Sequence, residues 1–153
     1  MIEQPDVVET EALEAAVIYL TIPRESIRQE MGRAIGELMG AIAAQGISPT
    51  GPIFTHHLRM DPGVFDFEVG VPVSSTIADT GRVRPGELPA ATVARTIYHG
   101  PYDGLHDAWG EFDAWVKANG HVAAPDLWEC YVAGPESSDN PEDWHTELNR
   151  RLT

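Results

Sequence analysis

Residues 126–131 have the sequence DLWECY, an aromatic and apolar run that contains the carboxylates Asp126 and Glu129. Tryptophan and tyrosine favour β-strands, in which successive side chains point to opposite faces. This alternation defines two faces, Leu127, Glu129 and Tyr131 on one and Trp128, Cys130 and Val132 on the other. We expect the Trp128 face to pack into a core, so that Glu129 faces away from it.

Two interpretations of Glu129 follow from this segment. The face that carries Glu129 is either in contact with solvent, which makes Glu129 an ordinary surface acid, or it lines a cleft. In a cleft, Glu129 would be a charged anchor among aromatic side chains. Most isolated acids are solvated, so the choice depends on the rest of the chain.

Composition limits the function classes. The chain has 153 residues, enough for one domain with a core, and its formal net charge is −14. Such a charge argues against direct binding of nucleic acid and attracts cationic ligands. The single cysteine, Cys130, excludes an internal disulfide, and we interpret it as a small buried hydrophobic residue. The chain begins without a signal-peptide pattern and contains no apolar run of about 20 residues, so we expect a cytoplasmic protein without a membrane segment.

The hydrophobic pattern predicts the same series of elements twice, strand, helix, strand, strand. Val7 and Val8 are a possible earlier strand start. Ser26 is a candidate N-cap with Gln29 completing a capping box, and Gly46 and Gly120 are the expected helix stops. The predicted strands are 16–22, 52–60, 64–73, 88–98, 126–133 and 144–152, the helices are 27–45 and 103–119, and 74–87 is an irregular connector.

The two halves also repeat in spacing. Gly46 and Gly120 are 74 positions apart, Pro52 and Pro125 are 73 apart, and Phe-Glu-Val at 67–69 matches Thr-Glu-Leu at 146–148. We infer an internal duplication in one domain of 1–153, with repeats of about 7–73 and 88–152. The predicted fold is α+β: duplicated β-α-β-β units with pseudo-two-fold symmetry, an antiparallel sheet, both helices on one face and a ligand cleft on the other.

An offset of 73 residues aligns Glu129 with His56 and extends the candidate cleft into the first half. The strand face around His56 is too apolar to be simply solvated, which favours a groove for a ligand. The predicted ligand-binding residues are Glu129, Tyr131, Leu127, Phe54, His56, Leu58, Met60, Tyr19, Glu68, Tyr102 and Glu147.

The second half resembles a known family. The segments that carry the resemblance are IYHGPYDGLHDAWGEFDAW at 97–115, LWECY at 127–131 and WHTEL at 144–148. They are similar to the GyrI-like small-molecule-binding domain, the effector-binding domain of AraC- and MerR-type multidrug regulators. The resemblance extends from about residue 7 to the end. It implies a duplicated β-α-β-β fold in which the acid after the tryptophan, here Glu129, lies at the bottom of the cleft.

The resemblance implies a binding protein for hydrophobic, often cationic, aromatic compounds. A carboxylate among aromatic rings suits such a ligand, since ring faces also attract cations. A hydrolase that opens the cyclopropane of DNA-alkylating compounds, with Glu129 and Tyr131 as catalytic residues, is the alternative. A protein-inhibitory partner of the gyrase-inhibitor type and a homodimer also remain open. The residues 149–152, Asn-Arg-Arg-Leu, lack the proline that the family usually has there, and the chain has no helix-turn-helix segment.

Histidines and serines add no further site. His56 and His57 point to opposite faces of a strand, and the other histidines lack the helical spacing of a zinc site. We expect no metal and no cofactor. The helix residues Trp109, Phe112, Trp115 and Val116 are expected to be core, while Tyr102 either plugs the helix start or borders the cleft.

Overall fold

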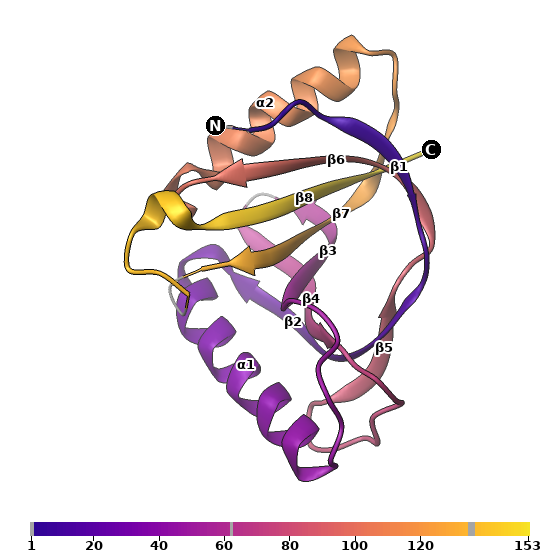
Figure 1. Ribbon diagram of the computed structural model, residues 1–153, viewed down its shortest axis with the longest axis vertical. Helices are drawn as coiled ribbons and strands as arrows, with labels where there is room; N and C mark the ends of the chain where they lie inside the picture. The colour runs from indigo at the N-terminus through magenta and orange to yellow at the C-terminus, as the bar shows by residue number, and fades with distance from the viewer. Residues whose placement is uncertain (1, 62, 135–136) are drawn as a thin grey trace. The chain divides into compact units, whose positions relative to one another are not determined.

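A computed structural model of the chain describes residues 2–61, 63–134 and 137–153, without the side chains of 24, 28 and 59–61. The chain has an α+β fold and divides into two compact units (Figure 1). We call Glu11–Ala90 the central unit, and Met1–Thr10 together with Ala91–Thr153 the terminal unit. No helix among the described residues is long and apolar enough to cross a membrane.

The central unit is an antiparallel sheet with one long helix. Its described strands lie in the order β5-β2-β4-β3. In chain order the elements are β2 (Leu13–Pro23), a short 3-10 turn (Arg24–Ser26), α1 (Ile27–Ala44), β3 (Phe54–Asp61), β4 (Val64–Pro72) and β5 (Arg84–Leu88).

One face of this sheet packs on α1. The alternation predicted for β4 is confirmed, because Phe67, Val69 and Val71 are buried in the same cluster as Leu38 and Ile42 of the helix. Gly46, at φ 68°, follows the helix as its expected stop. The expected capping box is wrong, since Ser26 makes no side-chain capping bond and instead ends the 3-10 turn.

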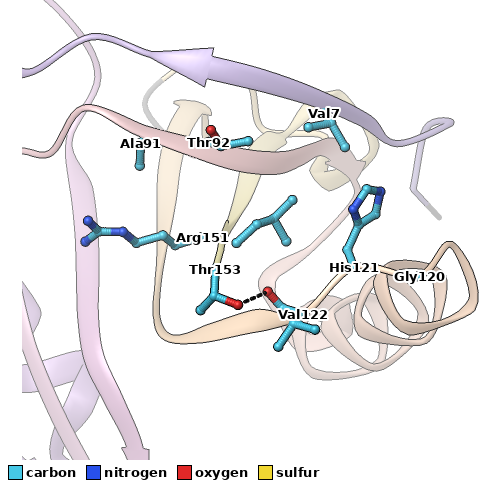
Figure 2. A pocket seen from close by; sticks show the side chains of 9 residues that line it. Val7, Ala91, Thr92, Gly120, His121, Val122, Arg151 and Thr153 are labelled. Carbon is cyan, nitrogen blue, oxygen red and sulfur yellow. Dashed lines mark hydrogen bonds between the residues drawn. The ribbon is translucent and has the colours of Figure 1, made fainter.

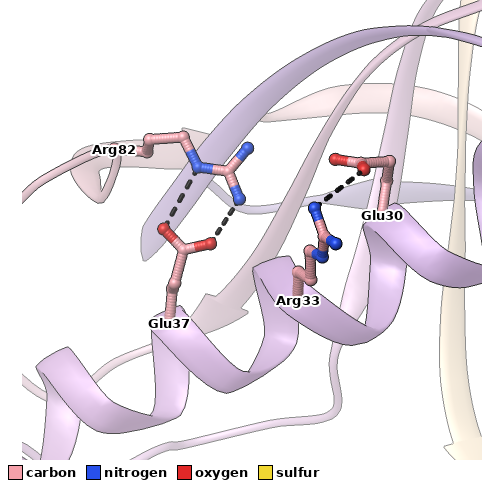
Figure 3. A network of polar contacts seen from close by, with 4 residues as sticks. All are labelled: Glu30, Arg33, Glu37 and Arg82. Carbon is pink, nitrogen blue, oxygen red and sulfur yellow. Dashed lines mark hydrogen bonds and ion pairs between the residues drawn. The ribbon is translucent and has the colours of Figure 1, made fainter.

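The connector is more ordered than its sequence indicates. Ile77 and Val83 are buried in the core of α1, and residues 84–88 form the unpredicted strand β5 on the edge of the unit's sheet. Arg82 pairs with Glu37 of α1 through two hydrogen bonds (Figure 3), and this bond lowers the pKa of the Glu37 carboxyl. The pair is exposed, so we ascribe the order of the connector mainly to its buried apolar side chains.

The terminal unit has a similar plan. Its described strands lie in the order β1-β6-β8-β7 and pair in antiparallel fashion. In chain order the elements are β1 (Asp6–Thr10), β6 (Ala91–His99), a 3-10 turn (Tyr102–Gly104), α2 (Leu105–Ala118), β7 (Ala123–Ala133), a 3-10 turn (Pro141–Asp143) and β8 (His145–Leu152). Residues 7–10 pair with β6, although the sequence places them in the first repeat.

The two units share one strand order around one helix, as a repeat predicts, while the duplication itself stays a prediction. Their registers correct the offset. Val69 lies beside Thr55 and packs on α1, and Leu148 lies beside Glu129 and packs on α2. Glu129 therefore corresponds to Thr55, 74 positions earlier, and not to His56. The offset of 73 came from Pro125, which lies where the β7–β8 register shifts between Ala123 and Leu127.

A tight contact fixes the turn before α2. The hydroxyl of the buried Tyr98 donates a hydrogen bond to the Pro101 carbonyl at 2.8 Å. Gly104 lies against the same hydroxyl, and a Cβ at this position would collide with it. The turn therefore requires glycine at 104 for steric reasons, and it sets the position of Tyr102.

We predict that Gly104→Ala destabilises the protein by roughly 1–3 kcal/mol, because Tyr98 is buried, hydrogen-bonded and unable to move aside. Gly110→Ala is the control. A Cβ on Gly110, in α2, meets nothing within 4 Å, so the higher helix propensity of alanine should leave stability unchanged or raise it. Denaturant unfolding measures both variants. Equal unfolding free energies for the two would contradict this account of the turn.

Candidate functional site

Glu129 lies on the face of β7 that α2 covers. Its cross-strand neighbour Leu148 is buried in the α2 core, and the indole of Trp109 in α2 donates directly to the Glu129 carboxylate. The expectation that Glu129 points away from the helix, with Trp128 and Cys130 as the helix-packing face, is therefore wrong. Both of those residues are buried, but on the other side of the strand, and Val132 is exposed.

The Glu129 carboxylate is buried and held at both oxygens. Only 8% of the residue is exposed. The Trp109 indole nitrogen donates to Oε2 at 2.6 Å, and the Tyr131 hydroxyl donates to Oε1 at 2.7 Å. Tyr131 reaches the acid because it follows by two residues on the same face of the strand. Hydrogen bonds to an ionised group are among the stronger ones, so these two bonds fix the orientation of the carboxylate.

Aromatic rings continue from these two donors. Tyr102 contacts Tyr131 edge-on at 5.9 Å between ring centroids, and it contacts Trp144 at 5.2 Å. Trp144 is anchored by its indole nitrogen, which donates to the Ser138 carbonyl at 2.9 Å. We define the aromatic cluster as Tyr102, Trp109, Tyr131 and Trp144. Buried or half-buried acid and aromatic faces together form a chemical setting for an organic cation.

The structure brings Trp109 into the site, although the sequence pattern assigned it to the core. Its ring does pack on Phe112, at 5.6 Å. Its polar nitrogen carries the missed information, because an indole N–H inside a protein usually requires an acceptor. Of the predicted residues, Glu129, Tyr131 and Tyr102 lie together, and Leu127 is buried on the same strand face.

Glu147 does not share this arrangement. It lies opposite Cys130, on the other face of the sheet, where it accepts a hydrogen bond from Asn149 at 3.2 Å and lies 3.4 Å from Arg95. Arg95 also donates to Asn149 at 2.8 Å. Glu147 is therefore part of a polar network behind the strand that carries Glu129, and the expectation that it reaches the same face is not met.

The other predicted residues belong to the central unit. Glu68 of β4 lies between Tyr19 of β2 and His56 of β3, on the face away from α1. Burial raises the pKa of Glu68, while the nearby His56 opposes that shift. Phe54 is fully buried, and Leu58 is 36% exposed. The side chain of Met60 lies outside the described residues. The part that these residues play in a site with Glu129 stays a prediction.

Cys130 is buried in the terminal unit. Burial, followed by the charge of Glu147, raises the pKa of its thiol to about 12. The thiolate is the reactive form of cysteine, so this environment confirms that Cys130 is a packed side chain and not a nucleophile.

We predict that Cys130 in the folded protein resists thiol reagents at pH 8. An unfolded cysteine has a pKa of about 8.5, so the thiolate fraction at pH 8 should be roughly a thousandfold lower in the folded chain. Labelling with a chromogenic disulfide reagent, with and without denaturant, measures the difference. Rapid labelling of the native protein would contradict the assignment.

A hollow of about 450 Å³ lies elsewhere in the terminal unit (Figure 2). Residues of β1, β6, β8 and the loop after α2 line it, and none of them is a predicted ligand-binding residue. Its arginine, Arg151, lies 3.4 Å from the Asp126 carboxylate, and the Thr153 hydroxyl donates to the Val122 carbonyl at 3.3 Å. These side chains already have protein partners, so the candidate site is the one around Glu129.

Two histidines meet across neighbouring strands, which spacing along the chain did not reveal. The rings of His99 and His145 are 4.5 Å apart, and His99 Nε2 lies 2.6 Å from a Glu3 carboxylate oxygen. Within the described ranges, no group of three or more histidine, cysteine or acidic residues is arranged to hold a metal ion.

The comparisons with known proteins agree with a binding domain of this architecture. The sequence matches the family model of the GyrI-like small molecule binding domain over residues 3–149. The chain therefore belongs to the GyrI-like small-molecule-binding family. No protein of curated function matches the sequence significantly.

Several solved structures share the fold. The C-terminal domain of EcmrR superposes with a TM-score of 0.86 and 22% identity over 98% of this chain and 97% of that domain. In the EcmrR–DNA complex, the match has a TM-score of 0.85 and 23% identity and covers 97% of this chain but 57% of the EcmrR chain.

Two smaller relatives match along most of their length. SAV2435, solved bound to tetraphenylphosphonium, has a TM-score of 0.72 and 14% identity over 99% of this chain and 94% of its own. A hydrolase from Listeria innocua has a TM-score of 0.71 and 12% identity over 98% and 92%. At these identities the likeness establishes the fold alone.

Proposed function

We propose that this domain binds hydrophobic aromatic cations and that Glu129 receives their positive charge. The observation that carries the proposal is a buried carboxylate held by Trp109 and Tyr131 beside the rings of Tyr102 and Trp144. A carboxylate out of water gains more from a nearby cation than a solvated one, because the surrounding medium screens the attraction less. Ring faces add roughly 0.5–2 kcal/mol for each cation placed over them.

Two further facts support a cationic ligand. The net charge of −14 attracts cations toward the protein and repels anions. A structural relative, SAV2435, was solved with the aromatic cation tetraphenylphosphonium. Within the proposed site, Leu127 supplies apolar surface, and Tyr102 borders the aromatic cluster where it is 37% exposed. Phe54, His56, Leu58, Met60, Tyr19 and Glu68 remain proposed contributors from the central unit.

We predict that Glu129→Gln weakens binding of tetraphenylphosphonium at least tenfold, because the amide keeps the shape of the side chain but removes its charge. Isothermal titration calorimetry measures the affinity. Glu147→Gln is the matched control: it removes the same charge from the same unit on the opposite face of the sheet, and it should change affinity less than about twofold. Unchanged binding by the Glu129 variant would overturn the proposed anchor.

A hydrolase is the second candidate, favoured by the 2.7 Å contact between the Tyr131 hydroxyl and Glu129. In this reaction the oxygen of a water molecule bonds to a cyclopropane carbon, and a ring carbon–carbon bond breaks. The electron pair moves into a conjugated carbonyl, which takes up a proton. Glu129 would accept the proton from water as general base, while the aromatic cluster holds the flat substrate.

We predict turnover only if this second function holds. The wild-type protein and Glu129→Gln are each incubated with a cyclopropane conjugated to a carbonyl, and mass spectrometry follows the product that has gained one water. A product formed by the wild type and lost in the variant supports a hydrolase. Glu129-dependent binding of the intact compound without product would assign the domain as a receptor and exclude hydrolysis of this substrate.

A further inference from the structure

Thr146 has an unusual environment for a buried hydroxyl. It lies in β8 between Tyr98 of β6 and Tyr131 of β7, and it is 0% exposed. Within the part of the chain that the structure describes, its hydroxyl oxygen has no hydrogen-bond partner. Leaving a buried hydroxyl unpaired costs roughly 1–3 kcal/mol, whereas valine would fill the same space without that cost.

The two neighbouring tyrosines direct their hydrogens elsewhere. Tyr98 donates to the Pro101 carbonyl at 2.8 Å, and Tyr131 donates to Glu129 at 2.7 Å. A hydroxyl has one hydrogen to donate, so neither tyrosine also donates to Thr146. Stability alone therefore does not account for a threonine at this position.

Thr146 lies in the candidate ligand site. It shares the α2-covered face with Leu148, which is the direct neighbour of Glu129, so Thr146 and Glu129 are diagonal neighbours on one face. Such neighbours are typically about 7–8 Å apart in an antiparallel sheet. Glu129 also leans toward the row of Thr146, because its Oε1 accepts the bond from Tyr131, the direct neighbour of Thr146. A single nitrogen atom between them can reach both oxygens.

We propose that Thr146 is a second polar contact of the ligand site and that the preferred ligands are primary or secondary aromatic ammonium compounds. This inference rests on the proposed function. An ammonium group with two N–H bonds donates one to the Glu129 carboxylate and one to the Thr146 hydroxyl oxygen. A quaternary cation has no N–H and uses only the charge of Glu129. Tyr102 is the most exposed ring of the aromatic cluster, so its displacement gives the ligand access to Thr146.

The experiment compares two probes that differ in one group. One is a fluorescent naphthalene with a methylaminoethyl arm, which is a secondary ammonium at pH 7, and the other carries a trimethylammonium arm. Thr146→Val should weaken binding of the secondary ammonium about tenfold, as expected for one lost hydrogen bond, and leave the trimethylammonium probe within about twofold. Thr146→Ser retains the hydroxyl and should restore the preference.

A matched control comes from a second buried threonine. Thr96 is 3% exposed and its hydroxyl donates to the Glu3 carbonyl at 2.7 Å, so Thr96→Val should lower stability without changing the ratio of the two affinities. Equal weakening of both probes by Thr146→Val, or no change in either, would overturn the inference. If neither probe binds the wild type in a Glu129-dependent manner, the proposed function fails instead, which is a distinguishable result.

Discussion

The terminal unit is organised around the need to satisfy a buried carboxylate. Glu129 lies in the layer between α2 and its sheet, where an unpaired polar group is costly and an unpaired charge more so. The two donors that meet this need, Trp109 and Tyr131, come from the helix and from the strand. The acid thereby fixes a helix side chain against a strand side chain. Tyr131 in turn contacts Tyr102, whose position depends on the turn locked by Tyr98.

The sequence predicted this acid correctly but placed it on the wrong side. Element order, the alternation in β4 and the helix stops were all recognisable from hydrophobic periodicity and glycine positions. Glu129 stood out because it is isolated in an aromatic strand. Its face was inferred from the assumption that the more apolar set packs on the helix. Trp128 and Cys130 are indeed buried, so both faces of this part of β7 are largely covered, and apolar character cannot distinguish them.

The repeat offset reinforced the same mistake. Side chains alternate with a period of two, so an error of one residue exchanges every side chain between faces. The helix stops gave 74, in agreement with the observed register, but the prolines gave 73 because the β7 register shifts just after Pro125. An irregularity of this kind has no sequence signal in a single chain. Trp109 was missed for another reason, since helical spacing reports burial and does not report what an indole nitrogen contacts.

The topological counterparts in the central unit clarify which residues are specialised. There, Thr55, His57 and Phe67 occupy the positions of Glu129, Tyr131 and Thr146, and His57 stacks on Phe67 at 5.0 Å. The same strand geometry can thus place a carboxylate, a phenol and a hydroxyl between helix and sheet, or an aromatic stack beside an α1 core. Packing alone favours the second arrangement, because a buried acid and an unpaired hydroxyl both oppose folding. The polar set in the terminal unit therefore has its physical rationale in a ligand and not in the stability of the fold.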